Sequence, residues 1–306
     1  MSRGAATRYL SPLRYPGGKA SISNFVAELI EAQRQRLSQY VEPFAGGAGV
    51  GLRLLFDEHV DEIVLNDLDP GVAAFWRAVF ERTSELTEKV KSTLPTLEEW
   101  HRQRAIYEKG KGNDLRLGFA TFFLNRTNRS GILNARPIGG LNQTGKWGIG
   151  ARYDGERLAE RITRLGAYSS RVTICSEDGI DLLGRYLNDG RSFIYVDPPY
   201  LQKGDELYLD NLNWSDHERL AKVLKSARNW MLTYDKDPRA LKLYPTQRCA
   251  LFGIAHTAGV QHIGNEYAVF ADGLVIPTIR NLGRGDARFV RRSSVSQSSS
   301  TAPSGL

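Results

Sequence analysis

The stretch "YVEPFAGGAGVGLRLLF" (residues 40–56) passes from a short apolar strand through a run of glycines into a helix. Glycines let the backbone turn tightly and approach a ligand closely, and the first turn of a helix favours an anionic group. A glycine-rich turn alone is equally typical of an ordinary tight connection between a strand and a helix. The segments on either side therefore decide between the two interpretations.

The next predicted strand favours the ligand-binding interpretation. In "EIVLNDLD" (62–69) an apolar run ends in acids, and Asp67 and Asp69 follow the glycines by about twenty residues. In nucleotide-binding sheets an acid at this spacing accepts hydrogen bonds from ribose hydroxyls. The two stretches together predict a cofactor that contains a nucleoside, and they leave open which cofactor it is.

Strands and helices alternate over much of the chain, which predicts a largely parallel, doubly wound α/β sheet. The alternation is interrupted at 128–153, which has seven Gly or Pro residues and no periodicity. We therefore expect a discontinuous, Rossmann-like catalytic domain (1–80 and 171–285). A mostly helical insert that carries a loop or hairpin is expected at 81–170. The final segment, 286–306, is expected to be a disordered Ser-rich tail because it has little apolar surface to bury.

Basic residues are concentrated in the expected insert. Between His101 and Arg171 the chain has fourteen Lys and Arg against five Asp and Glu, an excess of nine positive charges. The whole chain has a formal net charge of only +7. A local excess larger than that of the entire chain favours a polyanionic partner, and we expect this partner to be nucleic acid.

The composition disfavours several other classes of protein. No apolar run reaches the ~18 residues that a membrane span needs, and the N-terminus has no apolar core of signal-peptide length. Cys175 and Cys249 lie far apart in apolar runs, and no Cys and His residues have metal-site spacing. We expect a cytoplasmic, nucleoid-associated monomer without a membrane partner or a bound metal.

A second candidate site follows the strand predicted at 192–200. In "FIYVDPPYL" (193–201) the two prolines end the strand because they cannot donate ladder hydrogen bonds. Asp197 and the Pro198 carbonyl are acceptors, and the ring of Tyr200 offers a stacking surface. These groups can hold a planar molecule with an –NH₂ group, at the edge where open α/β sheets bind ligands.

These motifs resemble those of the Dam-type (D12 class, group alpha) DNA adenine N6-methyltransferases. The order is the family's: a glycine-rich cofactor motif, a recognition insert and then DPPY. Most of residues 9–275 are covered by the matching stretches, which are "RYPGGKA" (14–20), "EPFAGGAGVGL" (42–52), "LNDLDP" (65–70), "FFLNRTNRSGILNARP" (122–137), "CSEDGIDLL" (175–183), "VDPPY" (196–200) and "NEYAVF" (265–270). After "FFLNR" the chain departs from the tyrosine- and glycine-rich continuation of GATC-specific members, so its recognition sequence is left open.

The resemblance implies a Rossmann-like methyltransferase that uses S-adenosylmethionine. Lys19 would lie near the cofactor and the catalytic pocket, Asp67 would bind the ribose hydroxyls and Asp178 would contact the cofactor's adenine. The implied cofactor-binding residues are Tyr15, Lys19, Glu42, Pro43, Phe44, Gly46, Gly47, Gly49, Asp67 and Asp178.

The resemblance also implies the reaction. Adenine N6 is a poor nucleophile because its lone pair is delocalised, and in a duplex it is paired, so the base must be flipped out. Asp197 and the Pro198 carbonyl would accept its two N–H hydrogens while Tyr200 stacks on the ring. The implied catalytic residues are Asp197, Pro198, Pro199 and Tyr200.

The insert supplies the expected contacts to double-stranded DNA. Arg and Asn side chains can read base edges in the major groove, whereas Lys contacts phosphates as a point charge. The expected DNA-binding residues are Arg126, Asn128, Arg129, Asn134, Arg136, Asn142, Lys146, Lys109 and Lys111.

Alternatives stay open at the level of the residues. Asp197 and Pro198 would serve any exocyclic amine, so cytosine N4 and an RNA base are alternative acceptors. A homologue that binds DNA without catalysis is a further alternative, although its motifs would then be expected to have decayed. Restriction–modification, phage-encoded and housekeeping roles are all compatible with the sequence.

Overall fold

A computed structural model describes residues 10–15, 18–110, 113–199, 212–256 and 262–291 of the chain. Tyr200, Lys111 and the predicted tail from 292 onward lie outside the described residues. Within the described ranges no helix is long and apolar enough to cross a membrane.

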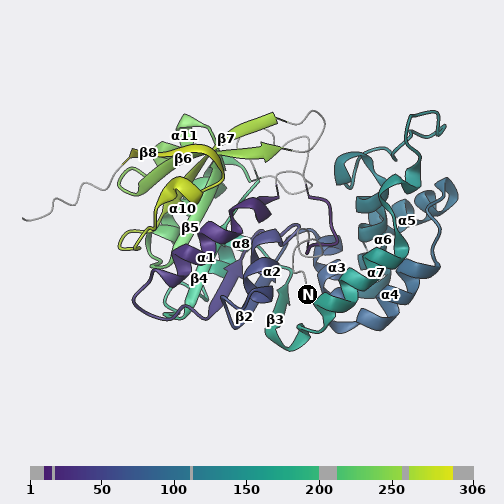
Figure 1. The fold of residues 1–306 in the computed structure, drawn as a ribbon, viewed down its shortest axis with the longest axis horizontal. Coiled ribbons are helices and arrows are strands. Elements are labelled where there is room, and N and C mark those ends of the chain that lie inside the picture. The colour runs from purple at the N-terminus through teal and green to yellow at the C-terminus, as the bar shows by residue number, and fades with distance from the viewer. Residues whose placement is uncertain (1–9, 16–17, 111–112, 200–211, 257–261, 292–306) are drawn as a thin grey trace, which may run out of the picture.

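The described strands form one mixed sheet in the order β3-β2-β1-β4-β5-β7-β6-β8 (Figure 1). The strands are β1 (Gln39–Glu42), β2 (Glu62–Asn66), β3 (Val172–Cys175), β4 (Ser192–Val196), β5 (Trp230–Asp235), β6 (Arg248–His256), β7 (His262–Phe270) and β8 (Arg284–Arg291). The first five run parallel to their neighbours, and β7, β6 and β8 add antiparallel pairs. This arrangement confirms the predicted α/β sheet. The strand order reverses between β1 and β4, where such sheets bind ligands.

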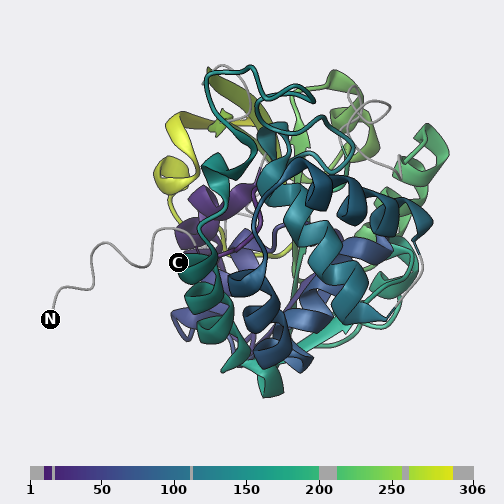
Figure 2. The ribbon, with the colours of Figure 1, turned by 90° about the vertical axis from the view of Figure 1, so that its right-hand side faces the viewer.

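Helices cover the sheet and extend to one side of it. Helix α1 packs against α2, and α10 packs against α8 and α11. Figure 2 views the molecule from the right-hand side of Figure 1, with the helices of 81–170 toward the viewer. The described α-helices are α1 (Ser23–Glu31), α2 (Gly49–Phe56), α3 (Pro70–Glu81), α4 (Thr83–Ser92), α5 (Leu97–Lys109), α6 (Asp114–Thr127), α7 (Gly155–Gly166), α8 (Gly179–Leu183), α10 (Trp214–Lys225) and α11 (Pro238–Leu243). Short 3₁₀ turns are η1 (Lys19–Ile22), η2 (Arg129–Gly131), η3 (Ile149–Arg152), η4 (Ser169–Arg171) and η5 (Ile279–Asn281).

Helices α4 to α7 lie beside the sheet and are joined to it through α3 (Figure 1). Helix α6 is apolar on nearly all sides, and Phe122 stacks on Phe75 of α3 with ring centroids 5.7 Å apart. A Cβ at Gly118 would lie 2.6 Å from the Ala74 carbonyl oxygen, so glycine permits the close approach of the two helices. The boundaries of the insert, 81–170, stay a prediction.

The loop expected at 128–153 contains η2, η3 and one isolated bridge between Asn128 and Pro137, with no named strand. One boundary of the predicted tail is wrong, because Arg284–Arg291 forms β8 and the tail was predicted to begin at 286. Strand β8 is an edge strand whose residues are exposed or half-buried, and it pairs with β6. Backbone pairing orders this segment despite its polar composition, which the apolar content alone could not indicate.

Candidate active site at the carboxyl edge of the sheet

An acid stands at or just beyond the end of each parallel strand. Glu42 and Asp235 are the last residues of β1 and β5, Asp67 and Asp197 directly follow β2 and β4, and Asp178 lies three residues after β3. Carboxyl ends of parallel strands meet at one edge of a sheet, so these acids share that edge. Glu42 and Asp197 flank the position where the strand order reverses.

Asp197 is held by two neighbouring side chains, Lys19 and Thr233, each of which has a further buried partner. The Lys19 Nζ atom lies 3.0 Å from Asp197 Oδ2 and 3.3 Å from Glu266 Oε1. Thr233 donates its hydroxyl to Asp197 Oδ1 over 2.6 Å, and the hydroxyls of Thr233 and Tyr195 lie 2.9 Å apart. The Lys19 and Glu266 side chains are only 3% and 2% exposed, whereas that of Asp197 is 22% exposed. Buried partners thus fix the orientation of the Asp197 carboxylate, and part of this carboxylate stays exposed to solvent.

Thr233, which donates to Asp197, and Glu266, which pairs with Lys19, were not predicted as site residues from the sequence. Thr233 belongs to β5, the neighbour of β4, and Glu266 belongs to β7, opposite Asp235 in the antiparallel register. The sequence did contain a signal for Glu266, because a charged residue inside the apolar stretch "NEYAVF" is expensive to bury without a partner. The partner, Lys19, is distant in the sequence, so only the fold brings the two together.

Glu42 is the most deeply buried acid among those at the parallel strand ends, with 4% of the residue exposed. Burial, followed by repulsion from Asp197, raises the pKa of its carboxyl well above the ordinary value of 4.5. Burial, followed by repulsion from Glu42, also raises the pKa of the neighbouring Tyr40 hydroxyl. Glu42 therefore keeps its proton to a higher pH than an exposed glutamate does.

The glycine turn between β1 and α2 is held from two directions. The Gly46 N–H donates to Asp67 Oδ2 over 2.8 Å, and Trp76 Nε1 donates to the Gly46 carbonyl over 2.9 Å. Gly46 has a φ of +46°, and a Cβ there would lie 2.7 Å from the ring of Tyr15. Glycine is therefore required both by the backbone conformation and by the close packing of Tyr15, which also lies against Gly47.

Asp67 and Asp69, which the sequence left as alternatives, have different environments. Asp69 caps helix α3 by accepting from the Gly71 N–H, and it also accepts the Tyr107 hydroxyl over 2.7 Å. Its carboxylate is thus committed to the fold. Asp67 directly follows β2, and its carboxylate accepts from the Gly46 and Asp69 N–H groups. Its contact with a ribose stays a prediction.

The predicted adenine-contacting residue, Asp178, already has partners in the structure. It caps helix α8 by accepting from Ile180 N over 2.8 Å, and its Oδ2 lies 2.8 Å from Arg219 Nη2. A Cβ at Gly179 would lie 3.0 Å from the Phe44 ring and 2.8 Å from the Pro43 carbonyl. The structure thus brings Pro43, Phe44 and Asp178 to the same edge, and the contact of Asp178 with a cofactor stays a prediction.

Gly49 opens helix α2, and a Cβ there would lie 3.0 Å from the Ala20 side chain beside Lys19. Pro198 is buried and Pro199 half-buried directly after Asp197. The glycine turn, Lys19 and the DPPY stretch therefore meet at one end of the sheet, as the motifs predicted. Tyr200, the fourth predicted catalytic residue, lies outside the described part of the chain.

The predicted DNA-contacting residues of the insert divide by exposure. The exposed ones are Lys109, Arg129, Asn134, Arg136, Asn142 and Lys146. Asn128 is 0% exposed, and its amide accepts from Trp100 Nε1 over 2.6 Å and donates to the Ile132 and Leu133 carbonyls. The prediction that Asn128 contacts DNA is therefore wrong, because all its polar atoms are used to shape the loop.

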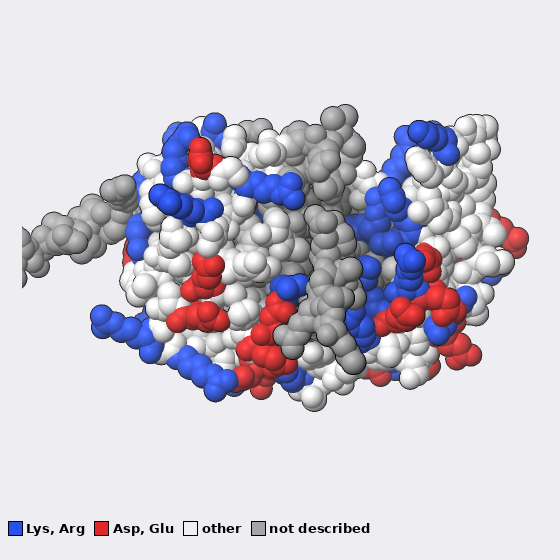
Figure 3. Space-filling model, in the orientation of Figure 1, with Lys and Arg blue, Asp and Glu red and all other residues white. Residues whose placement is uncertain are grey.

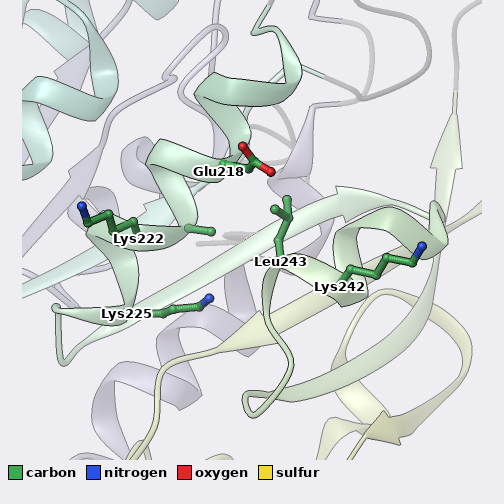
Figure 4. A pocket seen from close by; sticks show the side chains of 6 residues that line it. Glu218, Lys222, Lys225, Lys242 and Leu243 are labelled. Atoms are coloured by element: carbon green, nitrogen blue, oxygen red, sulfur yellow. The ribbon is translucent and has the colours of Figure 1, made fainter.

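Two further surface features are visible. Figure 3 shows Lys and Arg side chains gathered along the flank of the insert that faces the sheet. An open hollow between α10 and α11 lies apart from the predicted site residues (Figure 4), and it is lined by Glu218, Ala221, Lys222, Lys225, Lys242 and Leu243. Among the described residues no group of three or more His, Cys, Asp or Glu side chains could hold a metal ion.

Comparison with known proteins identifies the family. A family model, "D12 class N6 adenine-specific DNA methyltransferase", matches residues 15–261. The type II methyltransferase M.MjaIII of Methanocaldococcus jannaschii is 23% identical over 204 residues, which cover 61% of this chain and 68% of that protein. The type II methyltransferase M.CviBI of Paramecium bursaria Chlorella virus NC1A is 22% identical over 221 residues, covering 71% and 79%.

Among solved structures, the rRNA methyltransferase aviRa from Streptomyces viridochromogenes overlaps with a TM-score of 0.39 at 14% identity, covering 88% of this chain and 93% of that chain. The family match extends from the segment before Lys19 through the glycine turn and the DPPY stretch into the final hairpin. The chain is thus an enzyme that methylates adenine in DNA in a site-specific manner, and it belongs to the D12 class of N6 adenine-specific DNA methyltransferases.

Proposed function

We propose that this enzyme transfers a methyl group from S-adenosylmethionine to N6 of an adenine that is flipped out of double-stranded DNA. The placement of Asp197 carries the proposal. Its carboxylate lies at the reversal point of the sheet, is fixed by Lys19 and Thr233, and keeps an exposed share toward the site. A fixed acceptor at this place suits an exocyclic amine better than it suits a group without N–H hydrogens.

The residues at this edge fit S-adenosylmethionine. Helix α2 begins directly after the glycine turn without a side-chain cap, so N–H groups of its first turn can serve as donors to the carboxylate of the cofactor. Asp67 is the acid for the ribose hydroxyls, and the partly exposed carboxylate of Asp197 favours a cation. When bound, this cofactor supplies an electrophilic methyl group on a positively charged sulfur.

The residues of this chain then prepare the acceptor. One N6 hydrogen is accepted by Asp197 and the other by the Pro198 carbonyl, which favours a tetrahedral nitrogen with its lone pair free. Lys19 and Thr233 keep the two carboxylate oxygens of Asp197 in place while the new N–C bond forms. N6 loses one proton in the reaction, to Asp197 or to water. Tyr200, outside the described residues, is assigned to stacking on the flipped base.

The exposed residues of the insert support double-stranded DNA as the substrate. Arg129, Arg136 and Asn134 have the side chains that read guanine and adenine in the major groove, and they lie on a breaker-rich loop. We propose that the protein acts as a monomer in the cytoplasm, where the substrate DNA lies. Two relatives are named type II methyltransferases, which supports a role in restriction–modification.

Radiolabelled methyl transfer tests this function. Purified enzyme is incubated with methyl-labelled S-adenosylmethionine and duplex DNA, single-stranded DNA or RNA, and the products are digested to nucleosides. The expected product is N6-methyladenine, formed most rapidly on the duplex and absent with the Asp197→Ala variant. Label in N4-methylcytosine, faster labelling of RNA or labelling by the variant would contradict the proposal.

A further inference from the structure

Four arginines meet where the N-terminal segment crosses the insert. They form the arginine cluster, Arg14, Arg126, Arg152 and Arg161. Arg126 Nε donates to the Arg152 carbonyl over 2.7 Å, and its Nη1 lies 3.4 Å from the Pro12 carbonyl. Arg161 Nη1 donates to the Ser11 carbonyl over 3.0 Å. Backbone carbonyls thus hold the Arg126 and Arg161 side chains in place without neutralising their charge.

Acidic partners are absent from the arginine cluster. Among the described residues none of the four arginines forms a salt bridge, and Arg14 Nη1 is a buried donor with no hydrogen-bond acceptor. Three other arginines of the insert, Arg102, Arg104 and Arg157, each pair with an acid on their own helix or at its cap. Because no acid of the described residues pairs with these four arginines, their positive charges favour an anion that comes from outside the chain.

The like charges of the cluster repel one another. Burial, followed by the charges of Arg14, Arg161 and Arg152, lowers the pKa of Arg126 to about 9. Burial and then Arg152 lower the pKa of Arg14, and burial and then Arg164 lower that of Arg161. The side chains stay charged at neutral pH, so an anion with several acceptor oxygens would relieve both the repulsion and the unmet donors.

The cluster is tied to the catalytic edge through the backbone of Arg14. The Arg14 N–H donates to Asn125 Oδ1 over 2.7 Å, and its carbonyl accepts from Asn125 Nδ2 over 2.9 Å. The next residue, Tyr15, packs on the glycine turn, and Lys19 follows four residues later. The cluster is thus joined, through the backbone of Arg14, to the segment that carries Tyr15 and Lys19.

We propose that the arginine cluster binds a backbone phosphodiester of the substrate DNA beside the flipped adenine. The proposal rests on the function proposed above and adds a site that contacts the backbone without reading bases. Guanidinium groups match phosphate oxygens through paired N–H donors, and an anionic phosphodiester is the only charge that every DNA sequence presents at this place. The cluster thus fixes the strand, and the exposed insert loop reads the sequence.

Salt-dependent DNA binding tests the site. Fluorescence anisotropy is measured for two labelled duplexes over a series of salt concentrations. One duplex carries the unmodified target sequence of the enzyme, and the other carries a scrambled sequence. We expect Arg152→Gln and Arg14→Gln to weaken binding of both duplexes by the same factor. Each variant should also reduce the slope of log affinity against log salt by about 1. The matched control is Arg157→Gln on α7, whose side chain is 84% exposed and paired with Asp154.

A second readout separates a binding site from a structural one. Removing one of several repelling charges should leave the melting temperature of the free protein unchanged or raise it. Arg152→Gln suits this test because its exposed side chain is removed while its backbone carbonyl still serves Arg126. Wild-type salt slopes in both variants would overturn the proposal, whatever their melting temperatures. A wild-type enzyme that binds no duplex would overturn the proposed function as well.

Discussion

The catalytic edge of the sheet and the arginine cluster treat charge in opposite ways. At the catalytic edge Lys19 pairs with two carboxylates and Asp197 also accepts from Thr233, so each of these charged groups has a partner within the chain. In the cluster no described acid faces the arginines, and Arg14 keeps a buried donor without an acceptor. The first region is complete before substrate arrives, and the second requires an external anion.

The difference indicates how the enzyme divides its work. Chemistry on a weakly nucleophilic amine requires acceptors that do not reorganise, and a closed network of buried partners provides them. Binding to any DNA requires positive charge that the protein has not already neutralised. Substitutions in the two regions should therefore have separable effects, on turnover in the first and on binding in the second.

The largest effect is expected from Asp197→Ala. Loss of an acceptor for the reacting amine should lower the rate of methyl transfer by about 10²–10³-fold. Binding to duplex DNA and the melting temperature should change little, because the side chain is partly exposed at the end of a strand. Single-turnover kinetics at saturating DNA measure the effect, and a variant with near-normal rates would remove Asp197 from the catalytic role.

A smaller loss is expected from Glu266→Gln, which touches the site only through Lys19. Without the glutamate charge, Lys19 should shift toward Asp197, and misplacement of the aspartate should lower turnover roughly tenfold to a hundredfold. The Michaelis constant for DNA should stay near that of the wild type. If the Michaelis constant rises while turnover is unchanged, Glu266 belongs to substrate binding and the closed network is the wrong description.

In the insert loop we expect Arg136→Ala and Asn128→Ala to diverge. Arg136 is exposed, so its loss should cost about 1–3 kcal/mol of binding to the cognate duplex and relax the sequence preference. Asn128 is buried with its amide fully bonded, so its loss should lower the melting temperature. Competition binding and thermal melting distinguish them, and an Arg136 variant with unchanged preference would place base reading elsewhere in the chain.

The smallest expected effect concerns Glu42 and pH. Because burial raises its pKa in the folded protein, the folded state holds a proton that the unfolded state releases above about 4.5. The stabilisation that this proton gives to the folded state is complete below about pH 4.5. It is lost as the pH rises through the pKa of Glu42 in the folded protein. Glu42→Gln should therefore stabilise the free enzyme at neutral pH relative to the wild type.

Melting temperatures from pH 5 to 8 test the Glu42 prediction. The advantage of Glu42→Gln over the wild type should grow with pH and vanish near pH 5. Asp57→Asn on the opposite edge, whose acid is only partly buried and paired with Arg53, serves as the control. An advantage that is constant with pH would show that Glu42 is not the titrating group.

The fold was predictable wherever local pattern and burial agree. The alternation of strands and helices predicts the α/β sheet that the structure has, and the apolar run before Asp67 coincides with β2. Strand β8 was not predictable, because it is ordered by pairing with β6 and not by apolar burial. The same limit explains the tail boundary that was placed too early.

The site was predictable where chemistry is carried by a contiguous motif. Asp197 can be recognised from the two prolines that follow it, and Lys19 from the glycines that precede it. Gly46 can be recognised from the glycine run to which it belongs. Glu266 has no such neighbours and becomes a site residue only through antiparallel register. For Asn128 the sequence led to the opposite mistake. Its residue type suggested a contact with DNA bases, whereas its burial shows that it stabilises the fold.

The most direct test of the division of work compares Asp197→Ala and Arg152→Gln in one experiment. For each variant, two quantities are measured side by side: the affinity for the duplex that carries the unmodified target sequence, and the single-turnover rate at saturating DNA. The account predicts that Asp197→Ala keeps its affinity and loses the rate, and that Arg152→Gln loses affinity and keeps the rate. If both variants lose the same quantity, the catalytic edge and the arginine cluster do not act separately, and the account is contradicted.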